Sequence, residues 1–214
     1  MHRPTSTFGM FYACALALSL TSLTATAGEG GLYAPTAPKG STFIRGYNAS
    51  NNEQNFSIGN TDLSDIAPLA SSDFSFLPAG SYSAQVGSSS LPVKLEAEQF
   101  YTLVSQVGEP PKLVAEAPFN NKRKALLRVQ NLSDSTLSLK TADGKPVVDA
   151  VAPDANGQRE VNPVKVSLAL FDGERKVSDL KPVTLTRGEV VCLYITGSGK
   201  ALSPVWVKRP ARTE

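Results

Sequence analysis

The sequence predicts an all-β protein built from two tandem β-sandwich domains, Ig-like or jelly-roll-like. Apolar residues occur in short runs or alternate with polar ones, and no segment has the pattern of a long helix. Turn-forming residues separate the runs, most clearly at 78–80, Asp143-Gly144 and Asp172-Gly173. Many short strands divided by such turns are typical of a sandwich or barrel. Related motifs also recur in the two halves of the chain, which favours two copies of one unit.

The expected strands are short, and the first shows the clearest alternation. Between Thr42 and Tyr47, Phe43, Arg45 and Tyr47 share one face, while Ile44 and Gly46 share the other. Further apolar or alternating runs lie at 56–58, 82–86, 93–95, 100–107, 125–129, 137–139, 147–151, 164–171, 183–185, 190–195 and 205–207.

Two motifs recur in the same order in both halves. The pattern Ile-Arg-x-x-Asn-x-Ser at 44–50 matches Leu-Arg-x-x-Asn-x-Ser at 127–133. The pattern from Pro92 to Leu103 matches the one from Pro182 to Leu193, with identical internal spacing. The boundary between the two domains is expected near Gly108-Glu109-Pro110-Pro111, because two prolines interrupt the β pattern there. We therefore predict a first domain over 42–111 and a second over 112–214.

The N-terminal residues have the pattern of a cleaved secretory signal. Arg3 precedes an uncharged apolar stretch over 8–23, and Ala25-Thr26-Ala27 forms a small-x-small cleavage site. We expect residues 1–27 to be removed and 28–41 to form a loose lead, so that the mature chain is soluble and extracytoplasmic. Cys14 lies inside the signal, which leaves Cys192 without an internal disulfide partner. Because Cys192 lies in an apolar β run, it is expected to be a buried small hydrophobe rather than a reactive thiol.

The chemistry available to the mature chain is limited. Its only histidine, His2, belongs to the predicted signal, so a Ser-His-Asp or Cys-His site is excluded. Paired carboxylates and Ser–Lys pairs remain as routes to catalysis. Glu96 and Glu98 alternate on one expected strand and are interpreted as a solvated face. No phosphate-binding loop, dinucleotide fingerprint or calcium loop occurs, so we predict no cofactor and no metal.

Charge is distributed unevenly along the chain. Residues 28–114 carry 4 Lys and Arg against 8 Asp and Glu, whereas residues 115–214 carry 16 against 11. Basic clusters begin the second half at Lys122, Arg123 and Lys124 and end the chain at Lys208, Arg209 and Arg212. The first and last strands of a sandwich can lie near each other, so these clusters could form one patch for a polyanion. Outside the cytoplasm such a polyanion would be an acidic polysaccharide rather than nucleic acid, and ordinary solubilising charge is the alternative.

Three other side chains are candidates with two interpretations each. Arg45 and Arg128 occupy matching places in the repeat and point away from the apolar residue before them. They are candidate binding residues, and the alternative is a solvated outer face or a local salt bridge. Trp206 could stack on a sugar or close a core, and the apolar residues around it favour the core.

Several short motifs together resemble the AlgF family of alginate O-acetylation proteins. They are Leu-Tyr-Ala-Pro at 32–35, Phe-x-Arg-x-x-Asn at 43–48, Leu-Pro-Ala-Gly-x-Tyr at 77–82, the stretch 166–173 and the stretch 204–210. The motifs span essentially the whole chain after the signal, in order, and the resemblance rests on that order more than on any single piece.

The resemblance implies a periplasmic role in adding acetyl groups to mannuronate residues of alginate. The partners that it implies are periplasmic alginate O-acetyltransferases and a membrane acetyl-donor component, with alginate itself as a further contact. Because no histidine is left for a transferase triad, we predict a non-catalytic adaptor and assign no catalytic residue. A binding module for an anionic exopolysaccharide is the alternative, and an enzyme that transfers acyl groups through Ser and Lys or carboxylates is the third reading.

Overall fold

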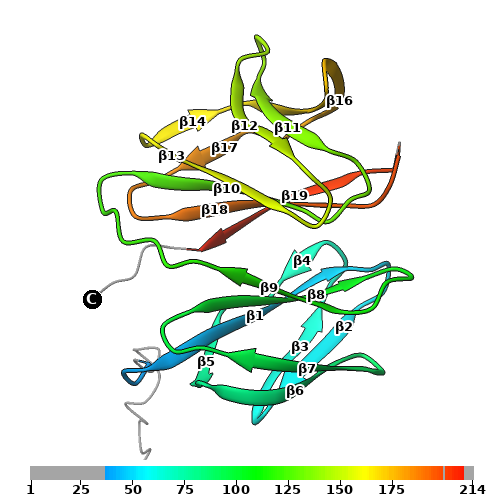
Figure 1. Cartoon of the computed structure of the whole chain (residues 1–214), viewed down its shortest axis with the longest axis vertical. Helices are drawn as coiled ribbons and strands as arrows, with labels where there is room; N and C mark the ends of the chain where they lie inside the picture. The colour runs from blue at the N-terminus through cyan, green and yellow to red at the C-terminus, as the bar shows by residue number, and fades with distance from the viewer. Residues whose placement is uncertain (1–36, 200, 210–214) are drawn as a thin grey trace, which may run out of the picture. The chain divides into compact units, whose positions relative to one another are not determined.

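The computed structural model describes residues 37–199 and 201–209 and confirms the all-β class (Figure 1). The predicted signal peptide, most of the lead and Arg212 lie outside the described residues. Within the described residues the chain forms strands and turns without a helix, so none that could span a membrane is present there.

The first sandwich packs a five-stranded sheet against a four-stranded one. In the five-stranded sheet the order is β4-β1-β8-β9, with β5 also paired to β1, and the other sheet has the order β3-β2-β6-β7. The strands are β1 Ser41–Ala49, β2 Gln54–Ile58, β3 Thr61–Ile66, β4 Ala70–Ser71, β5 Ser75–Pro78, β6 Gly80–Val86, β7 Ser89–Leu95, β8 Phe100–Gln106 and β9 Lys112–Glu116.

The second sandwich has the same plan with one sheet divided. Its first sheet has the order β13-β10-β18-β19, and the opposite layer consists of β12-β11-β15-β16 and the separate pair β14-β17. The strands are β10 Ala125–Asn131, β11 Leu137–Thr141, β12 Pro146–Val151, β13 Asn156–Val161, β14 Val164–Val166, β15 Leu168–Asp172, β16 Arg175–Asp179, β17 Val183–Leu185, β18 Val190–Thr196 and β19 Ser203–Arg209.

The domain boundary falls later than the prolines suggest. Residues 107–111 form the turn of a hairpin, and β9 after them pairs antiparallel with β8, with Phe100 opposite Glu116. The chain passes to the second sandwich through residues 117–124. Pro110 and Pro111 are compatible with this hairpin because they lie in its turn, where no ladder donor is needed.

An asparagine closes the turn after the first strand of the first copy. The Nδ2 atom of Asn48 donates to the carbonyl oxygens of Asn52 and Ile66, at 2.8 and 2.7 Å. Its Oδ1 accepts from the backbone N–H and the hydroxyl of Ser50, at 2.9 and 2.7 Å. One buried amide therefore joins β1 to the turn and to the end of β3.

The second copy repeats every one of these bonds. Asn131 Nδ2 donates to the carbonyl oxygens of Ser135 and Val151, and its Oδ1 accepts from the N–H and hydroxyl of Ser133. The strands that carry the two asparagines also pair alike, because β1 is parallel to β8 and β10 is parallel to β18. The structure thus agrees with the internal repeat.

The second motif also recurs in the strand pairing, and insertions explain its different offset. In the first copy β6 and β7 form one hairpin in which Tyr82 is opposite Val93. In the second copy β14 and β15 replace β6, β16 and β17 replace β7, and Val166 is opposite Val183. Since Val93 and Val183 match in the repeat, Val166 occupies the position of Tyr82. Extra residues between β16 and β17 divide the second hairpin into two pairs of strands.

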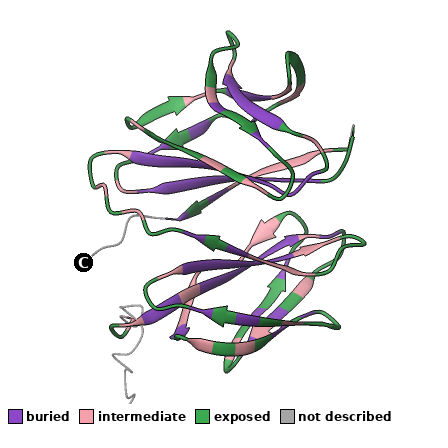
Figure 2. Cartoon of the chain, viewed as in Figure 1, coloured by how far each residue is buried: buried purple, intermediate pink, exposed green. Residues whose placement is uncertain are grey.

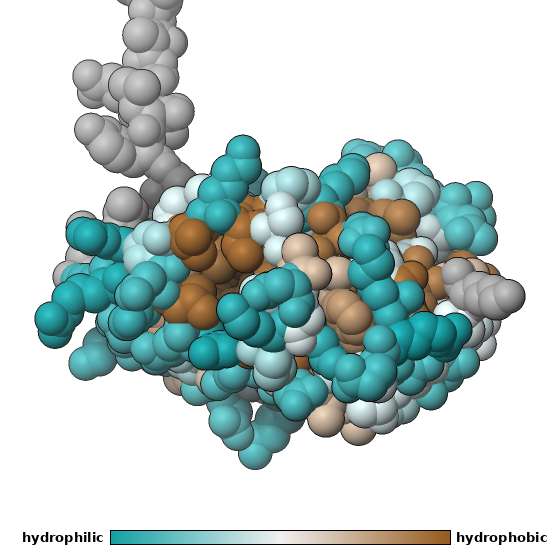
Figure 3. Space-filling model, turned by 90° about the horizontal axis from the view of Figure 1, so that it is seen from above, coloured by the Kyte–Doolittle hydropathy of each residue, from teal (hydrophilic) through white to brown (hydrophobic). Residues whose placement is uncertain are grey.

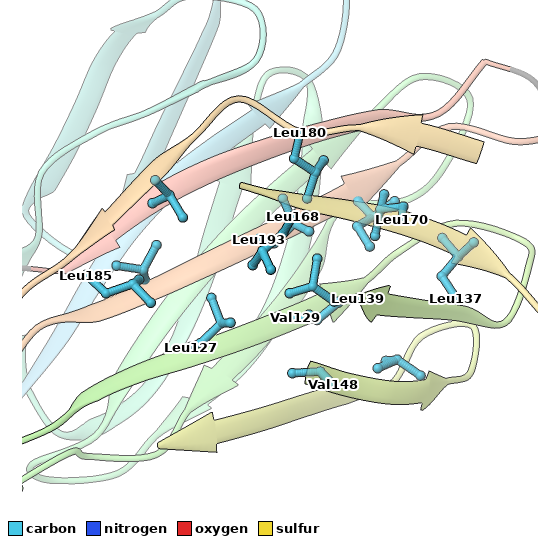
Figure 4. Packing of buried hydrophobic residues seen from close by; sticks show 14 of the residues in the cluster. Leu127, Val129, Leu137, Leu139, Val148, Leu168, Leu170, Leu180, Leu185 and Leu193 are labelled. Carbon is cyan, nitrogen blue, oxygen red and sulfur yellow. The ribbon is translucent and has the colours of Figure 1, made fainter. Parts of the chain in front are cut away.

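Alternation along the strands directs one side-chain face into each sandwich. Figure 2 shows that β10 and β18 are buried along their whole length, so both of their faces are covered. The core of the first sandwich lies between its sheets and includes Ile44, Phe56 and Leu103. The core of the second is leucine-rich, as Figure 4 shows for Leu127, Leu139, Leu170, Leu193 and their neighbours. A third cluster lies on the opposite faces of β1, β8, β9, β18 and β19 and at the residue after β10, and consists of Tyr47, Val104, Val114, Leu132, Cys192, Tyr194 and Val207.

Gly46 allows β1 to approach the facing sheet closely, and we expect Gly46→Ala to destabilise the protein. An added Cβ would lie 2.7 Å from Ile66 Cδ1 and 2.9 Å from Phe56 Cδ2. Overpacking of this kind costs about 1–3 kcal/mol, measured as the loss in free energy of unfolding in urea. Gly80→Ala is the matched control, because its Cβ would meet Tyr82 no closer than 3.5 Å. Equal stabilities of the two variants would contradict the close packing at Gly46.

Candidate functional site

The most unusual side chains of the protein meet in a buried charged cluster, which we call the junction cluster. It consists of Arg45 on β1, Thr102 on β8, Glu116 on β9, Arg128 on β10, Tyr194 on β18 and Arg209 on β19. The first three belong to the first sandwich and the last three to the second. Each one alternates with residues of its own sandwich core, so it points away from that core.

Glu116 is the centre of the cluster and accepts bonds from both sandwiches. Its Oε1 accepts from Arg45 Nη2 at 2.7 Å, from the Thr102 hydroxyl at 2.9 Å and from the Tyr194 hydroxyl at 3.0 Å. Its Oε2 accepts from Arg209 Nη1 at 3.4 Å. The Glu116 and Arg45 side chains are each 1% exposed. A carboxylate this deeply buried is tolerated because several donors surround it.

The electrostatics of the cluster follow from burial opposed by ion pairing. Burial alone would raise the pKa of Glu116, but Arg45, Arg209, the Thr102 hydroxyl and Arg128 outweigh it and lower the pKa below its usual value. Burial lowers the pKa of Arg209 to about 10, since the attraction of Glu116 only partly offsets it and two neighbouring guanidinium groups repel the charge. Three guanidinium groups around one carboxylate leave the junction cluster with excess positive charge.

Arg128 is the least well paired of the three arginines. Its Nε and Nη2 atoms donate to Gln158 Oε1 at 3.3 and 2.9 Å. Its Nη1 atom is buried 3.8 Å from Glu116 Oε2 and makes no hydrogen bond to the described residues. The interaction of Arg128 with the carboxylate is therefore electrostatic at this distance.

Aromatic rings cover the charges. The Arg45 guanidinium lies 4.5 Å from the ring centroid of Phe74, and that of Arg209 lies 4.0 Å from the centroid of Phe100. Tyr47 and Tyr194, one from each sandwich, pack with ring centroids 4.7 Å apart. Such contacts exclude water and strengthen the ion pairs beside them. The arrangement joins the two sandwiches and leaves the carboxylate with no proton to transfer at neutral pH.

Arg45 and Arg128 are not on a solvated face, so that interpretation is wrong. Both are buried, and Arg45 makes an ion pair with a partner 71 residues away instead of a local one. Glu116 could not be recognised from its own strand in the sequence, because a single glutamate at the end of a short alternating strand has the same pattern as a glutamate exposed to solvent. A signal was present, since Val114-x-Glu116 and Val207-x-Arg209 place opposite charges at matching positions of β9 and β19.

The other predicted basic residues lie near one end of the sheet that contains β10 and β18. Lys122 and Arg123 are exposed and Lys124 is half-buried in the segment before β10. Lys208 is exposed on β19, where its Nζ lies 3.2 Å from Glu189 Oε1 and donates to the Thr184 carbonyl. Arg209 turns inward to Glu116. The structure thus brings the basic segment before β10 and the basic end of β19 to the same end of the sheet, on either side of β18. Lys122 and Arg123 are exposed there, whereas Arg209 is buried in the junction cluster.

Trp206 packs against the core of the second sandwich, as the apolar sequence around it indicates. Its Nε1 atom donates to the carbonyl of Lys181 at 3.0 Å. Glu96 and Glu98 are exposed, but they lie in the turn after β7 and not on a strand. Within residues 37–199 and 201–209, no group of three or more His, Cys, Asp or Glu side chains is placed to hold a metal ion.

Cys192 is buried, as expected, and it belongs to the apolar cluster between the two sandwiches. Its thiol is free among the residues that the structure describes. Burial raises the pKa of its thiol to about 12. We therefore expect the folded protein to resist thiol reagents at neutral pH, because the reactive thiolate is scarce and shielded. Mass spectrometry of the Cys192 peptide after short alkylation would show little label in the folded protein and full label in denaturant. Rapid labelling of the folded protein would contradict the buried junction.

The fold and the junction cluster define a protein of two tandem β-sandwiches that are connected by buried charged and aromatic side chains. The chain belongs to the AlgF family, because the family model described as "Alginate O-acetyl transferase AlgF" matches residues 15–192. This confirms the resemblance found in the sequence.

Similar proteins carry the same family name. The alginate biosynthesis protein AlgF of Pseudomonas aeruginosa is 66% identical over 203 residues, which are 94% of this chain and 94% of that protein. The alginate biosynthesis protein AlgF of Azotobacter vinelandii is 62% identical over 187 residues, with 87% and 86% covered. The solved C-terminal domain of AlgF from P. aeruginosa is 73% identical, with a TM-score of 0.38, and covers 41% of this chain and 100% of that chain. The solved N-terminal domain is 63% identical, with a TM-score of 0.35, and covers 38% and 100%.

Proposed function

We propose that this protein is a non-catalytic adaptor in the O-acetylation of alginate. It acts in the periplasm after removal of residues 1–27, and it binds the periplasmic alginate O-acetyltransferases and the membrane acetyl-donor component. Family membership supports the link to alginate and to O-acetylation. The adaptor role is our own inference from the residues.

The observation that carries this proposal is that the buried ionisable groups hold the two sandwiches together and are not arranged for proton transfer. Glu116 has a lowered pKa and is enclosed by donors, so it is a poor proton carrier at neutral pH. Cys192 has a raised pKa and is enclosed as well. The sequence holds its only histidine at position 2. Glu116 and Cys192 both lie where the two sandwiches meet, and their contacts there favour a fixed arrangement of the sandwiches. A rigid scaffold that binds partners requires such an arrangement.

Binding of an anionic polymer is the weaker candidate. Of the basic residues considered for it, Arg45, Arg128 and Arg209 are buried in the junction cluster, and Lys208 is paired with Glu189. The described candidates outside the junction cluster are Lys208 and the basic residues at 122–124, a small set for a polymer that carries many charges.

The deciding experiment measures acetate on the secreted polymer from a deletion strain complemented with the wild-type chain. Loss of acetate on deletion, with polymer length kept and acetate restored by complementation, is the expected result. In parallel, the purified chain is expected to retain a periplasmic acetyltransferase in a pull-down and to transfer no acetyl groups to polymannuronate by itself. Unchanged acetate would refute the assignment to acetylation, and acetyl transfer by the chain alone would refute the adaptor role.

A further inference from the structure

A groove of about 500 Å³ opens at one end of the second sandwich. Its apolar lining includes Leu127, Leu168 and Leu185, which belong to the buried core, and Val147, Val161 and Val166, which pack against that core from the surface. Figure 4 shows Leu127 and Leu185 at the same end of the leucine cluster. In the space-filling view of Figure 3, apolar surface is visible between hydrophilic side chains. We call this feature the Val166 groove.

In the first sandwich, a tyrosine side chain fills the position that corresponds to this groove. Tyr82, the counterpart of Val166, packs against the core of the first sandwich and reaches over Gly59 and Gly80. Its hydroxyl donates to the carbonyl of Pro78 at 2.7 Å, which holds the ring in place. In the second copy the side chain at this position is only a valine, and no comparable ring covers the described residues of the groove. The second sandwich therefore has space where the first has an aromatic ring.

The rim of the groove is basic. Lys124, Lys145 and Arg159 line it together with Glu160 as the acidic residue. Lys124 Nζ donates to Asn162 Oδ1, and Arg159 Nη1 donates to the carbonyls of Pro146 and Val147, so the partners of these two cations are neutral oxygens. Lys145 is paired with Asp143. Among residues 37–199 and 201–209, Lys124 and Arg159 have no carboxylate partner, and they lie beside an apolar floor.

We propose that the Val166 groove binds an aromatic side chain of the acetyltransferase partner, with an acidic residue next to it. The ring would occupy the space that Tyr82 fills in the first copy, and the carboxylate would pair with Lys124 or Arg159. Buried aromatic anchors with a charged neighbour are the usual centres of binding energy in protein interfaces. This inference rests on the proposed adaptor function, because that function supplies the partner.

The test is the substitution Val166→Tyr, which places in the second sandwich the ring that Tyr82 provides in the first. The fold should survive, because a tyrosine at the matching position is part of the first sandwich. If the groove is a central anchor point, capture of the acetyltransferase should weaken by about 30-fold or more, as for loss of an interface hot spot. Val107→Tyr is the matched control, since Val107 is 61% exposed in the β8–β9 turn and far along the chain from the groove. Lys124→Glu, which reverses a charge at the rim of the groove, should also weaken capture.

A small-molecule probe tests the groove independently of the partner. Indole-3-propionate, an aromatic ring with a carboxylate, is titrated into the purified chain while methyl NMR signals are followed. Shifts at Val166, Leu127 and Leu185 that disappear in Val166→Tyr are expected. Absence of such shifts, or wild-type capture of the acetyltransferase by both Val166→Tyr and Lys124→Glu, would overturn the groove inference while the adaptor function stands. If the wild-type chain captures no acetyltransferase, the adaptor function fails and the proposed occupant fails with it, even where the probe still binds.

Discussion

Glu116→Gln is expected to lower the free energy of unfolding by about 3–5 kcal/mol, the usual cost of breaking a buried ion pair from one side. The substitution preserves the shape of the side chain but leaves Arg45, Arg128 and Arg209 buried without their carboxylate. The loss should appear in urea unfolding at neutral pH. Because the junction cluster joins the two sandwiches, the variant is also expected to unfold in two steps where the wild type unfolds in one.

Glu174→Gln is the control for this measurement. Glu174 is paired with Lys140 at 3.4 Å, but it is 99% exposed, so its removal should change stability by less than about 1 kcal/mol. Equal losses for Glu116→Gln and Glu174→Gln would show that the junction carboxylate contributes no more than a surface charge.

The contribution of Glu116 should also depend on pH in a defined direction. The folded-state pKa of Glu116 lies below its usual value of 4.5, so ionisation favours the folded state. This stabilisation is complete above the unfolded value and is lost as the pH falls through the lowered, folded-state pKa. The stability difference between wild type and Glu116→Gln should therefore be constant near neutral pH and shrink in acid.

Asn48→Ala and Asn131→Ala are each expected to destabilise the protein by about 3 kcal/mol, because each leaves several buried backbone groups without a partner. Asn48 alone serves two carbonyl oxygens and one backbone N–H, and Asn131 serves the matching three. Similar losses for the two variants, measured by urea unfolding, would reflect the equivalence of the two copies.

Asn55→Ala provides the comparison for the asparagine variants. Asn55 is exposed, and its Oδ1 accepts a single bond from the Asp65 N–H at 2.8 Å. Water can replace that bond, so a loss of about 1 kcal/mol or less is expected. An Asn48→Ala variant as stable as Asn55→Ala would mean that water also satisfies the buried turn.

Much of the fold could be predicted because it depends on neighbours along the chain. The alternation over 42–47 correctly assigns Ile44 to a core and Arg45 to the opposite face. The Asn-x-Ser spacing is local, so Asn48 and Asn131 form identical networks. The run around Cys192 indicated burial, which the structure confirms.

The junction could not be predicted in the same way. Alternation shows that Arg45 points away from Ile44, but it does not show whether water or a second sheet covers that face. Arg45 lies 71 residues from Glu116 and reaches it across β8 within one sheet, whereas Arg209 lies 93 residues away and meets it only because the sheets of the two sandwiches face each other. The prolines at 110 and 111 marked a break in the β pattern, but pairing with β8 assigned the strand after them to the first sandwich.

The sequence by itself determined the β class, the repeat, the family and the direction in which each strand residue points, because these follow from patterns over a few neighbouring residues. Only the tertiary structure decided which outward face is buried, which arginines are exposed to a ligand and where a groove remains open. Those outcomes depend on desolvation and on contacts between distant segments. The difference between Tyr82 and Val166 is an example, since a single side-chain size decides whether the end of a sandwich is filled or open.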